Sequence, residues 1–301
     1  MTMIEQTFRR AQGLISDPMN SGPALAVGRR VFGNNAGFKQ NVVGGLEIWN
    51  ARRNGPFSGN VLHDDTARAV ETVGYAKAPW RLERELVDTL EQRFEAAISQ
   101  KAVTEQFAED ESPVNVALKN PLSNAPEIRE VFDARMQAVV HAYFGSRVRI
   151  YTPDYWRNFH VKPEILANHE RFSERWHNDS GKVSILSVLI LMSDVNEEHG
   201  ATWCTTRTRT REIFREGLQY REHGGEVSSR LKNDHDSVQF TGQRGEMWFL
   251  NTRRTLHRAG IPGDSLQRDI LGLKFTPHAG DRDIWDETPA PEEKDLNWQS
   301  F

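Results

Sequence analysis

The chain has 301 residues, of which 38% are hydrophobic and 27% are charged, and its formal net charge is −4. This balance is typical of a globular protein, and it argues against a strongly basic nucleic-acid-binding protein. We expect one domain over residues 1–301. It would comprise a loop-rich and helical part (1–145), a β-barrel core (146–278) and a C-terminal tail (279–301).

Cys204 is the only cysteine, which excludes an internal disulfide and a cysteine-based zinc cluster. The first residues carry charges where a signal peptide needs an apolar core, and no apolar run approaches the roughly 18 residues of a membrane helix. We therefore expect a cytoplasmic protein, a monomer or homodimer, that binds a small molecule and neither a membrane nor nucleic acid.

Two helices are predicted in the first half of the chain. Residues 1–78 are rich in Gly, Asn and Arg without a helical period, and they predict short strands and loops. Apolar residues at three- and four-residue spacing predict an amphipathic helix over residues 80–101. A second helix is predicted over residues 126–144, capped by Ser123 or Asn124 and ended by Gly145.

After Gly145 the apolar residues alternate, which is typical of strands. Helices followed by a run of strands indicate helices packed on a pair of antiparallel sheets. The predicted fold is mainly β with flanking helices, a double-stranded β-helix or cupin-like jelly roll. The predicted strands span residues 147–161, 183–193, 201–210, 238–241, 246–250, 255–259 and 268–276.

The segment Arg-Trp-His-Asn-Asp at residues 175–179 contains the most informative motif. On an extended backbone the side chains of His177 and Asp179 point to the same side, so both can bind one ion. His257, which lies 80 residues later, is the best candidate for a third ligand. Two histidines and one carboxylate that leave coordination positions open form the site of non-haem Fe(II) oxygenases.

A second His-x-Asp motif occurs at His63-Asp64-Asp65. No buried strand follows it, and its neighbours are typical of a turn. We interpret it as a surface turn and not as the metal pair.

The order and spacing of four elements resemble the phytanoyl-CoA dioxygenase family of Fe(II)/2-oxoglutarate oxygenases, over roughly residues 150–277. The elements are His177-x-Asp179, Asn196-x-x-x-Gly200, the stretch 245–249 leading into His257, and Arg268 11 residues later. The resemblance implies three cosubstrates or cofactors: Fe(II), 2-oxoglutarate and O₂. It also implies that Arg268 binds the distal carboxylate of 2-oxoglutarate through paired hydrogen bonds, and that succinate and carbon dioxide are released.

The strand before the motif resembles a family strand that offers polar side chains to the cosubstrate. Trp156, Asn158 and His160 share one face of it by alternation. If that face is inward, Asn158 or His160 would hydrogen-bond the keto acid and Trp156 would contact the substrate. The alternative is a packed or solvated strand.

Two departures from the family pattern stand out. Ala259 occupies a position where the family commonly has the Ser or Thr that assists the arginine, so either another hydroxyl fills that role or the affinity for 2-oxoglutarate is lower. The Pro-Gly-Ser-His turn of the family is replaced by Thr206-Arg207-Thr208-Arg209.

The alternation of Thr and Arg over residues 205–211 predicts that Arg207, Arg209 and Arg211 lie on one side of a strand. They would bind an anionic substrate, or they would form a solvated, edge-protecting face. Arg253 and Arg254 are similar candidates for substrate binding. The remaining selectivity would come from the N-terminal third and from residues 213–233.

In the related halogenases a small residue replaces the carboxylate, and chloride binds iron at the vacant position. Here Asp179 is present, so halogenation is not the predicted reaction. Hydroxylation, desaturation or ring closure of a small molecule is therefore the predicted reaction. Two alternatives remain open: a cupin-like metalloenzyme that does not use 2-oxoglutarate, and a non-catalytic jelly-roll binding protein.

Overall fold

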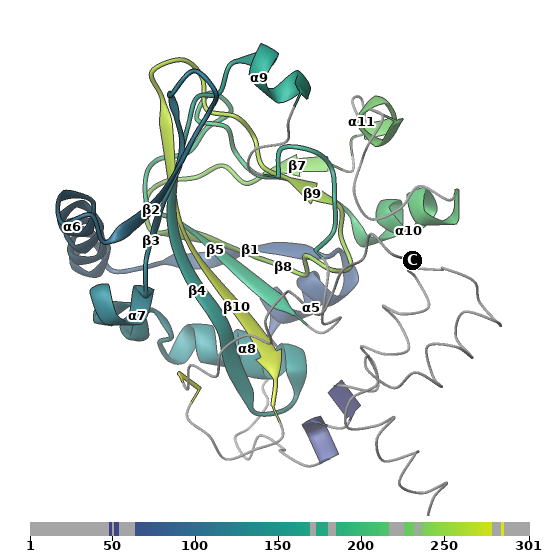
Figure 1. The fold of residues 1–301 in the computed structure, drawn as a ribbon. Coiled ribbons are helices and arrows are strands. Elements are labelled where there is room, and N and C mark those ends of the chain that lie inside the picture. Colours follow the sequence, from purple (N-terminus) through teal and green to yellow (C-terminus); the bar gives the residue numbers. More distant parts are fainter. Residues whose placement is uncertain are drawn as a thin grey trace, which may run out of the picture.

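The computed structural model describes residues 48–49, 51–53, 64–168, 173–179, 185–216, 226–231, 235, 237–278 and 284–285. Two antiparallel sheets face each other and form a jelly roll (Figure 1). The larger sheet has the strand order β1-β8-β5-β10-β4-β3-β2, and the smaller has the order β7-β6-β9. This confirms the predicted mainly β fold with flanking helices.

The bounds of the strands follow in chain order. They are β1 (Tyr75–Arg81), β2 (Val103–Phe107), β3 (Pro113–Leu118), β4 (Val148–Phe159), β5 (Leu186–Leu191), β6 (Trp203–Thr205), β7 (Ser237–Gln239), β8 (Glu246–Leu250), β9 (His257–Arg258) and β10 (Gln267–Pro277). The helices are α5 (Asp65–Thr72), α6 (Arg84–Ser99), α7 (Pro121–Asn124), the 3₁₀ helix η2 (Pro126–Val131), α8 (Ala134–Phe144), α9 (Pro163–Asn168), α10 (Arg207–Arg215) and α11 (Glu226–Leu231).

The two faces of the larger sheet have different environments, which the alternation along β10 illustrates. Leu271, Leu273 and Phe275 belong to the main hydrophobic core, together with residues of α6 and α8. Arg268 and Lys274 have the opposite parity and therefore point to the other face, into the jelly roll. Helices α6, α7 and α8 cover the outer face in Figure 1, so the inner face of β4 and β10 is left for a site.

Three strands precede the predicted barrel core. β1 lies at one edge of the larger sheet, and β2 and β3 form the other edge. Short strands were predicted up to residue 78, where β1 lies in part, but β2 and β3, between the two predicted helices, were not predicted. The strands β2 and β3 pair with each other as a hairpin. The pairing of β3 with β4, which is more distant in the sequence, joins this hairpin to the larger sheet.

Both predicted helices begin later than expected. Trp80 and Arg81 belong to β1, and α6 begins only at Arg84. The predicted helix over 126–144 is interrupted, because Asp133 has an extended backbone and its side chain accepts a hydrogen bond from the backbone N–H of Met136. Asp133, and not Ser123 or Asn124, thus caps α8.

Asp64 is also a helix cap. Its carboxylate accepts a hydrogen bond from the backbone N–H of Ala67 at 2.8 Å, at the start of α5. This helix lies in a region for which short strands and loops were predicted. The carboxylate of the His-x-Asp motif is that of Asp65, which forms a surface ion pair with Arg68 at 2.6 Å, and His63 lies outside the described residues.

The predicted strand over residues 201–210 is wrong in its second half. The strand ends at Thr205, and Thr206 caps α10 through a hydrogen bond from the backbone N–H of Arg209. On a helix, successive residues are turned by about 100°, so alternate residues do not share a face. Arg207, Arg209 and Arg211 therefore do not form one charged row.

Near the end of the described chain, Ile284 and Trp285 pack on the main core. The ring of Trp285 meets that of Phe132 edge-on, with the ring centroids 6.4 Å apart. Among the helices of the described residues, none has the length and apolar character needed to cross a membrane.

Candidate metal centre

The backbone brings the two predicted histidine ligands directly opposite each other. His177 and His257 exchange both backbone hydrogen bonds, at 2.9 and 2.8 Å, as an antiparallel bridge. Their imidazole rings therefore lie on the same side, with centroids 4.3 Å apart. Residues 80 positions apart in the sequence thus form one face of a site.

Each imidazole is oriented by a carbonyl two residues earlier. Nδ1 of His177 lies 2.8 Å from the oxygen of Arg175, and Nδ1 of His257 lies 3.2 Å from the oxygen of Thr255. A carbonyl only accepts, so each Nδ1 donates a proton, and Nε2 is the nitrogen that faces Asp179 and can bind a metal in the neutral imidazole. This is the tautomer that a metal ligand needs.

Asp179 completes the group. Its Oδ1 lies 3.8 Å from Nε2 of His177 and 3.7 Å from Nε2 of His257. The ligand atoms of the three residues all lie within 4.8 Å of one another. Neutral imidazoles and one carboxylate on a single face are a donor set that suits Fe(II) and leaves other positions open.

The second oxygen of Asp179 faces Lys274 of β10, whose Nζ lies 3.8 Å from Oδ2. Burial favours the protonated acid, but Lys274, His257 and His177, with the hydroxyl of Thr252, hold the pKa of Asp179 well below its usual range. The carboxylate is therefore ionised and oriented, with Oδ1 toward the imidazoles and Oδ2 toward a cation. Lys274 belongs to no metal-ligand motif, so the sequence alone did not indicate its role. Lys274 and Arg268 are an even number of residues apart on β10, and their side chains therefore point to the same inner face.

Arg268 is 2% exposed and lies on the inner face of β10. Its Nη1 donates to the backbone oxygen of Gly200, while its Nε has no hydrogen-bond partner. Burial lowers the pKa of Arg268 to about 10, and among the described residues no carboxylate lies within ion-pair distance. A charged guanidinium with open donors inside the protein fits an anionic carboxylate ligand.

Of the two other residues that were predicted to bind the cosubstrate, one lies beside Arg268 and the other lies beyond the end of the strand. Asn158 is buried directly opposite Arg268 in the β4–β10 register, and it accepts a hydrogen bond from Asn115 at 2.7 Å. His160 lies beyond the end of β4, where its Nδ1 is 2.9 Å from the oxygen of Pro262. Asn158 therefore lies beside the anion-binding candidate, whereas the partner of His160 belongs to a loop.

Trp156 is opposite Ile270 in the register, and it packs with Leu191 and Val195 on the inner face. Its ring covers Gly272, where an added Cβ would lie 2.7 Å from the ring. Glycine at this position thus allows the indole to lie flat against β10. Trp156 forms an apolar wall inside the jelly roll.

The arginines that were expected to bind substrate have structural contacts. Nη1 of Arg207 donates to the oxygen of Glu71, and burial with the nearby Arg254 and Arg211 lowers its pKa. Arg209 forms an ion pair with Glu212 on the surface of α10, at 3.0 Å. Arg253 is buried, and its carbonyl accepts a hydrogen bond from the amide of Asn178 beside the candidate ligands.

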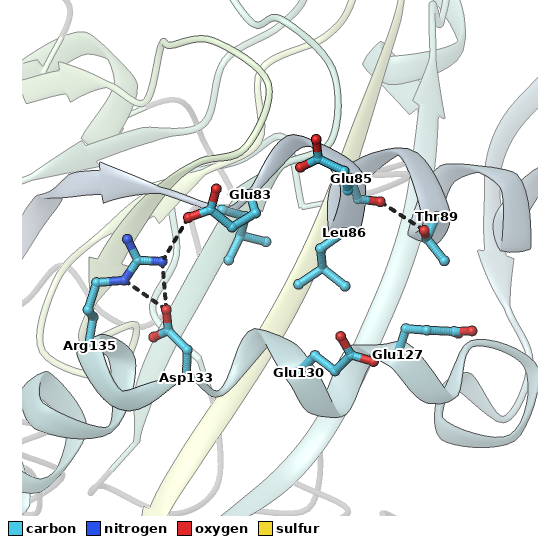
Figure 2. Close-up of a pocket in the computed structure, with 9 residues that line it drawn as sticks. Glu83, Glu85, Leu86, Thr89, Glu127, Glu130, Asp133 and Arg135 are labelled. Atoms are coloured by element: carbon cyan, nitrogen blue, oxygen red, sulfur yellow. Dashed lines mark hydrogen bonds and ion pairs between the residues drawn. The ribbon is translucent and has the colours of Figure 1, made fainter.

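A groove of about 560 Å³ on the outer face contains none of the predicted site residues. Figure 2 shows it between the start of α6 and the turn that joins η2 to α8, with Glu83, Glu85, Glu130 and Asp133 around it. Arg135 forms ion pairs with Glu83 and Asp133 across one end. The groove lies between helices, and the larger sheet separates it from the metal candidates.

Comparison with solved structures shows the same fold at low sequence identity. The epimerase SnoN, in complex with Fe³⁺, alpha-ketoglutarate and nogalamycin RO, has a TM-score of 0.51 and 16% identity, over 70% of this chain and 82% of SnoN. The carbocyclase SnoK from nogalamycin biosynthesis has a TM-score of 0.53 and 16% identity, over 76% and 91%. EctD from S. alaskensis with bound Fe has a TM-score of 0.52 and 14% identity, over 78% and 85%.

No curated protein sequence matches the chain. The family model "Phytanoyl-CoA dioxygenase (PhyH)" matches residues 70–261, which is most of the chain and includes all three metal-ligand candidates. The chain belongs to the phytanoyl-CoA dioxygenase (PhyH) family of iron- and 2-oxoglutarate-dependent enzymes.

Proposed function

We propose that the protein is an Fe(II)/2-oxoglutarate-dependent oxygenase that hydroxylates a small molecule, with release of succinate and carbon dioxide. The observation that carries this proposal is the pairing of two features inside one jelly roll. One is the metal-binding group His177, Asp179 and His257. The other is the buried, unpaired cation of Arg268.

Each residue has a defined role. His177 and His257 would hold the metal through Nε2, and Asp179 would hold it through Oδ1. Arg268 would bind the distal carboxylate of 2-oxoglutarate, beside Asn158. Bound iron and 2-oxoglutarate would supply the O₂-dependent oxidising chemistry.

The protein around the ligands would keep this chemistry away from water. Trp156, Leu191 and Ile270 form an apolar cluster on the inner face between Arg268 and Lys274. Such a wall limits water near the metal and strengthens the charged contacts of the site. Desaturation or ring closure would use the same protein residues as hydroxylation. The position of the substrate in the site would decide among the three reactions.

The expected setting is a reducing one such as the cytoplasm, because Cys204 is buried as a free thiol. The partner is a small molecule, and we propose that residues 1–301 act as one domain, as a monomer or a homodimer.

The proposal is tested by loading the protein with Fe(II) without oxygen, adding 2-oxoglutarate and following the visible charge-transfer absorption of the complex. Succinate is then measured after oxygen is admitted. We expect both signals in the wild type and neither in Asp179→Ala. Metal binding without any response to 2-oxoglutarate would favour the cupin-like alternative, and no metal binding would overturn the proposal.

A further inference from the structure

Asp154 is a charged residue on the inner face of the larger sheet that the proposed reaction does not use. It lies on β4 opposite Gly272 of β10, two residues before Trp156. Trp156 points into the jelly roll, and residues two apart on a strand point the same way. Asp154 therefore lies on the same face as Lys274, the lysine next to Asp179.

The carboxylate of Asp154 lacks a fixed partner. Among the described residues, no hydrogen bond or ion pair reaches it, unlike the buried Asp269 on the outer face, which pairs with Arg157. Asp154 is exposed to water. Yet burial among protein atoms raises its pKa, and Lys274 only partly offsets this effect. Asp154 is thus a carboxylate on the inner face that contacts both water and protein atoms.

Lys274 does not neutralise Asp154 directly. Its ammonium group lies within 4 Å of Asp179, at 3.8 Å, and Asp154 has no ion pair with it. The inner face therefore presents a negative charge that is not compensated by contact. An unpaired, partly desolvated carboxylate gains free energy from a ligand that donates charged hydrogen bonds.

We propose that Asp154 is a substrate-recognition residue that binds a protonated amine of the substrate. The inference rests on the proposed function, since it assigns the substrate class of the same site. Trp156 supports a cationic ligand as well, because an aromatic ring beside a carboxylate attracts ammonium groups. An anionic substrate group near Asp154 would be repelled.

The test uses Fe(II)-loaded protein with 2-oxoglutarate and no oxygen. A panel of amino acids, amino sugars and diamines is titrated, and each compound is compared with its N-acetylated form, which has lost the positive charge. In the wild type we expect at least one amine to bind about tenfold or more tightly than its N-acetylated form. Asp154→Asn is expected to remove this preference, and Asp154→Glu is expected to retain most of it.

Asp110→Asn is the matched control, because Asp110 is a surface carboxylate paired with Lys162, away from β4. It should leave the amine preference unchanged. The affinities for Fe(II) and 2-oxoglutarate should be the same in all variants, and a circular dichroism spectrum checks that each variant folds. Asp154→Ser provides a second charge-removing variant.

Two results would overturn the inference. One is a wild-type protein that binds no amine of the panel more tightly than its N-acetylated form. The other is an Asp154→Asn or Asp154→Ser protein that keeps the wild-type preference. If Fe(II) or 2-oxoglutarate fails to bind to the wild type, the proposed function fails instead, so the two failures are distinct.

Discussion

At the scale of single residues, the metal candidates are oriented by contacts on atoms other than their ligand atoms. The carbonyls of Arg175 and Thr255 fix the two imidazoles, and Lys274 faces the outer oxygen of Asp179. The three ligand atoms therefore converge without pairing strongly with one another. Such preorganisation lowers the cost of binding an ion.

Replacing any member of this group should weaken metal binding. We expect Asp179→Ala and His257→Ala to lower the affinity for Fe(II) or its stand-in Co(II) by at least about tenfold, since even the orienting partners of ligands have effects of about this size. Calorimetric titration of metal into the apoprotein measures this. His199→Ala is the control, because His199 is partly buried outside the metal-binding group and hydrogen-bonds Asn196. Equal affinities in the variants and the wild type would exclude this metal site.

Arg268 should determine the affinity for 2-oxoglutarate. We expect Arg268→Met to lose about 2 kcal/mol of binding, or roughly thirtyfold in Kd. The measurement is a titration of 2-oxoglutarate into the Fe(II)-loaded protein without oxygen. 2-Oxobutyrate, which lacks the distal carboxylate, should bind equally to the wild type and the variant.

The same variant should not destabilise the free protein, because the guanidinium has no counter-ion among the described residues. Replacing a buried, uncompensated charge with an apolar side chain is often neutral or stabilising. The melting temperature of the metal-free protein checks this expectation. A large decrease would indicate that Arg268 has a structural role.

At the scale of elements, the loop before β6 supports Arg268 through a glycine. Gly200 has a φ of +70°, and an added Cβ would lie 2.5 Å from the backbone of Ile261 and Pro262. Its carbonyl accepts the hydrogen bond from Arg268. The conformation of this loop and the position of the cosubstrate anchor are therefore coupled.

Gly200→Ala should cost about 3 kcal/mol of stability, from the positive φ and the backbone clash. It should also weaken binding of 2-oxoglutarate, because the carbonyl next to Arg268 must shift. Urea unfolding measures the first effect, and titration measures the second. Gly263→Ala is the control: its Cβ would meet Glu198 only at 3.3 Å and its φ is not positive, so less than about 1 kcal/mol is expected.

At the scale of the whole molecule, an ion-pair network fastens the helical layer to the strands that form the site. Arg157 of β4 pairs with Asp269 of β10 and with Glu95 of α6, both at 2.6 Å. Each of the two strands therefore carries a site residue on the inner face next to a paired charge on the outer face. Asn158 follows Arg157, and Arg268 precedes Asp269.

Asp269→Asn should lower stability by about 3 kcal/mol, because Arg157 would keep its buried charge without its main partner. Glu127→Gln removes the partner of the half-exposed Arg93 and should cost less than about 1 kcal/mol. Denaturant unfolding of both variants measures the difference. Similar losses would mean that burial does not distinguish the two ion pairs.

Part of this architecture follows from the sequence alone. The patterns of residues 246–250 and 268–276 predict strands, because Met247 and Phe249, and Leu271, Leu273 and Phe275, recur at every second position. The one-residue gap between His177 and Asp179 places both side chains on one side by local geometry. His257 was the best candidate for the third ligand from the sequence, and the family resemblance added the role of Arg268.

Other features depended on contacts between distant residues. The Thr-Arg alternation of α10 suits either a strand or a helix, and the cap by Thr206 with the packing of Ile213 decides for the helix. The partner of each strand is set by long-range pairing, which no local pattern encodes. Lys274 has no sequence motif; the β4–β10 register places it on the inner face with Asp154, and the fold brings it within 3.8 Å of Asp179.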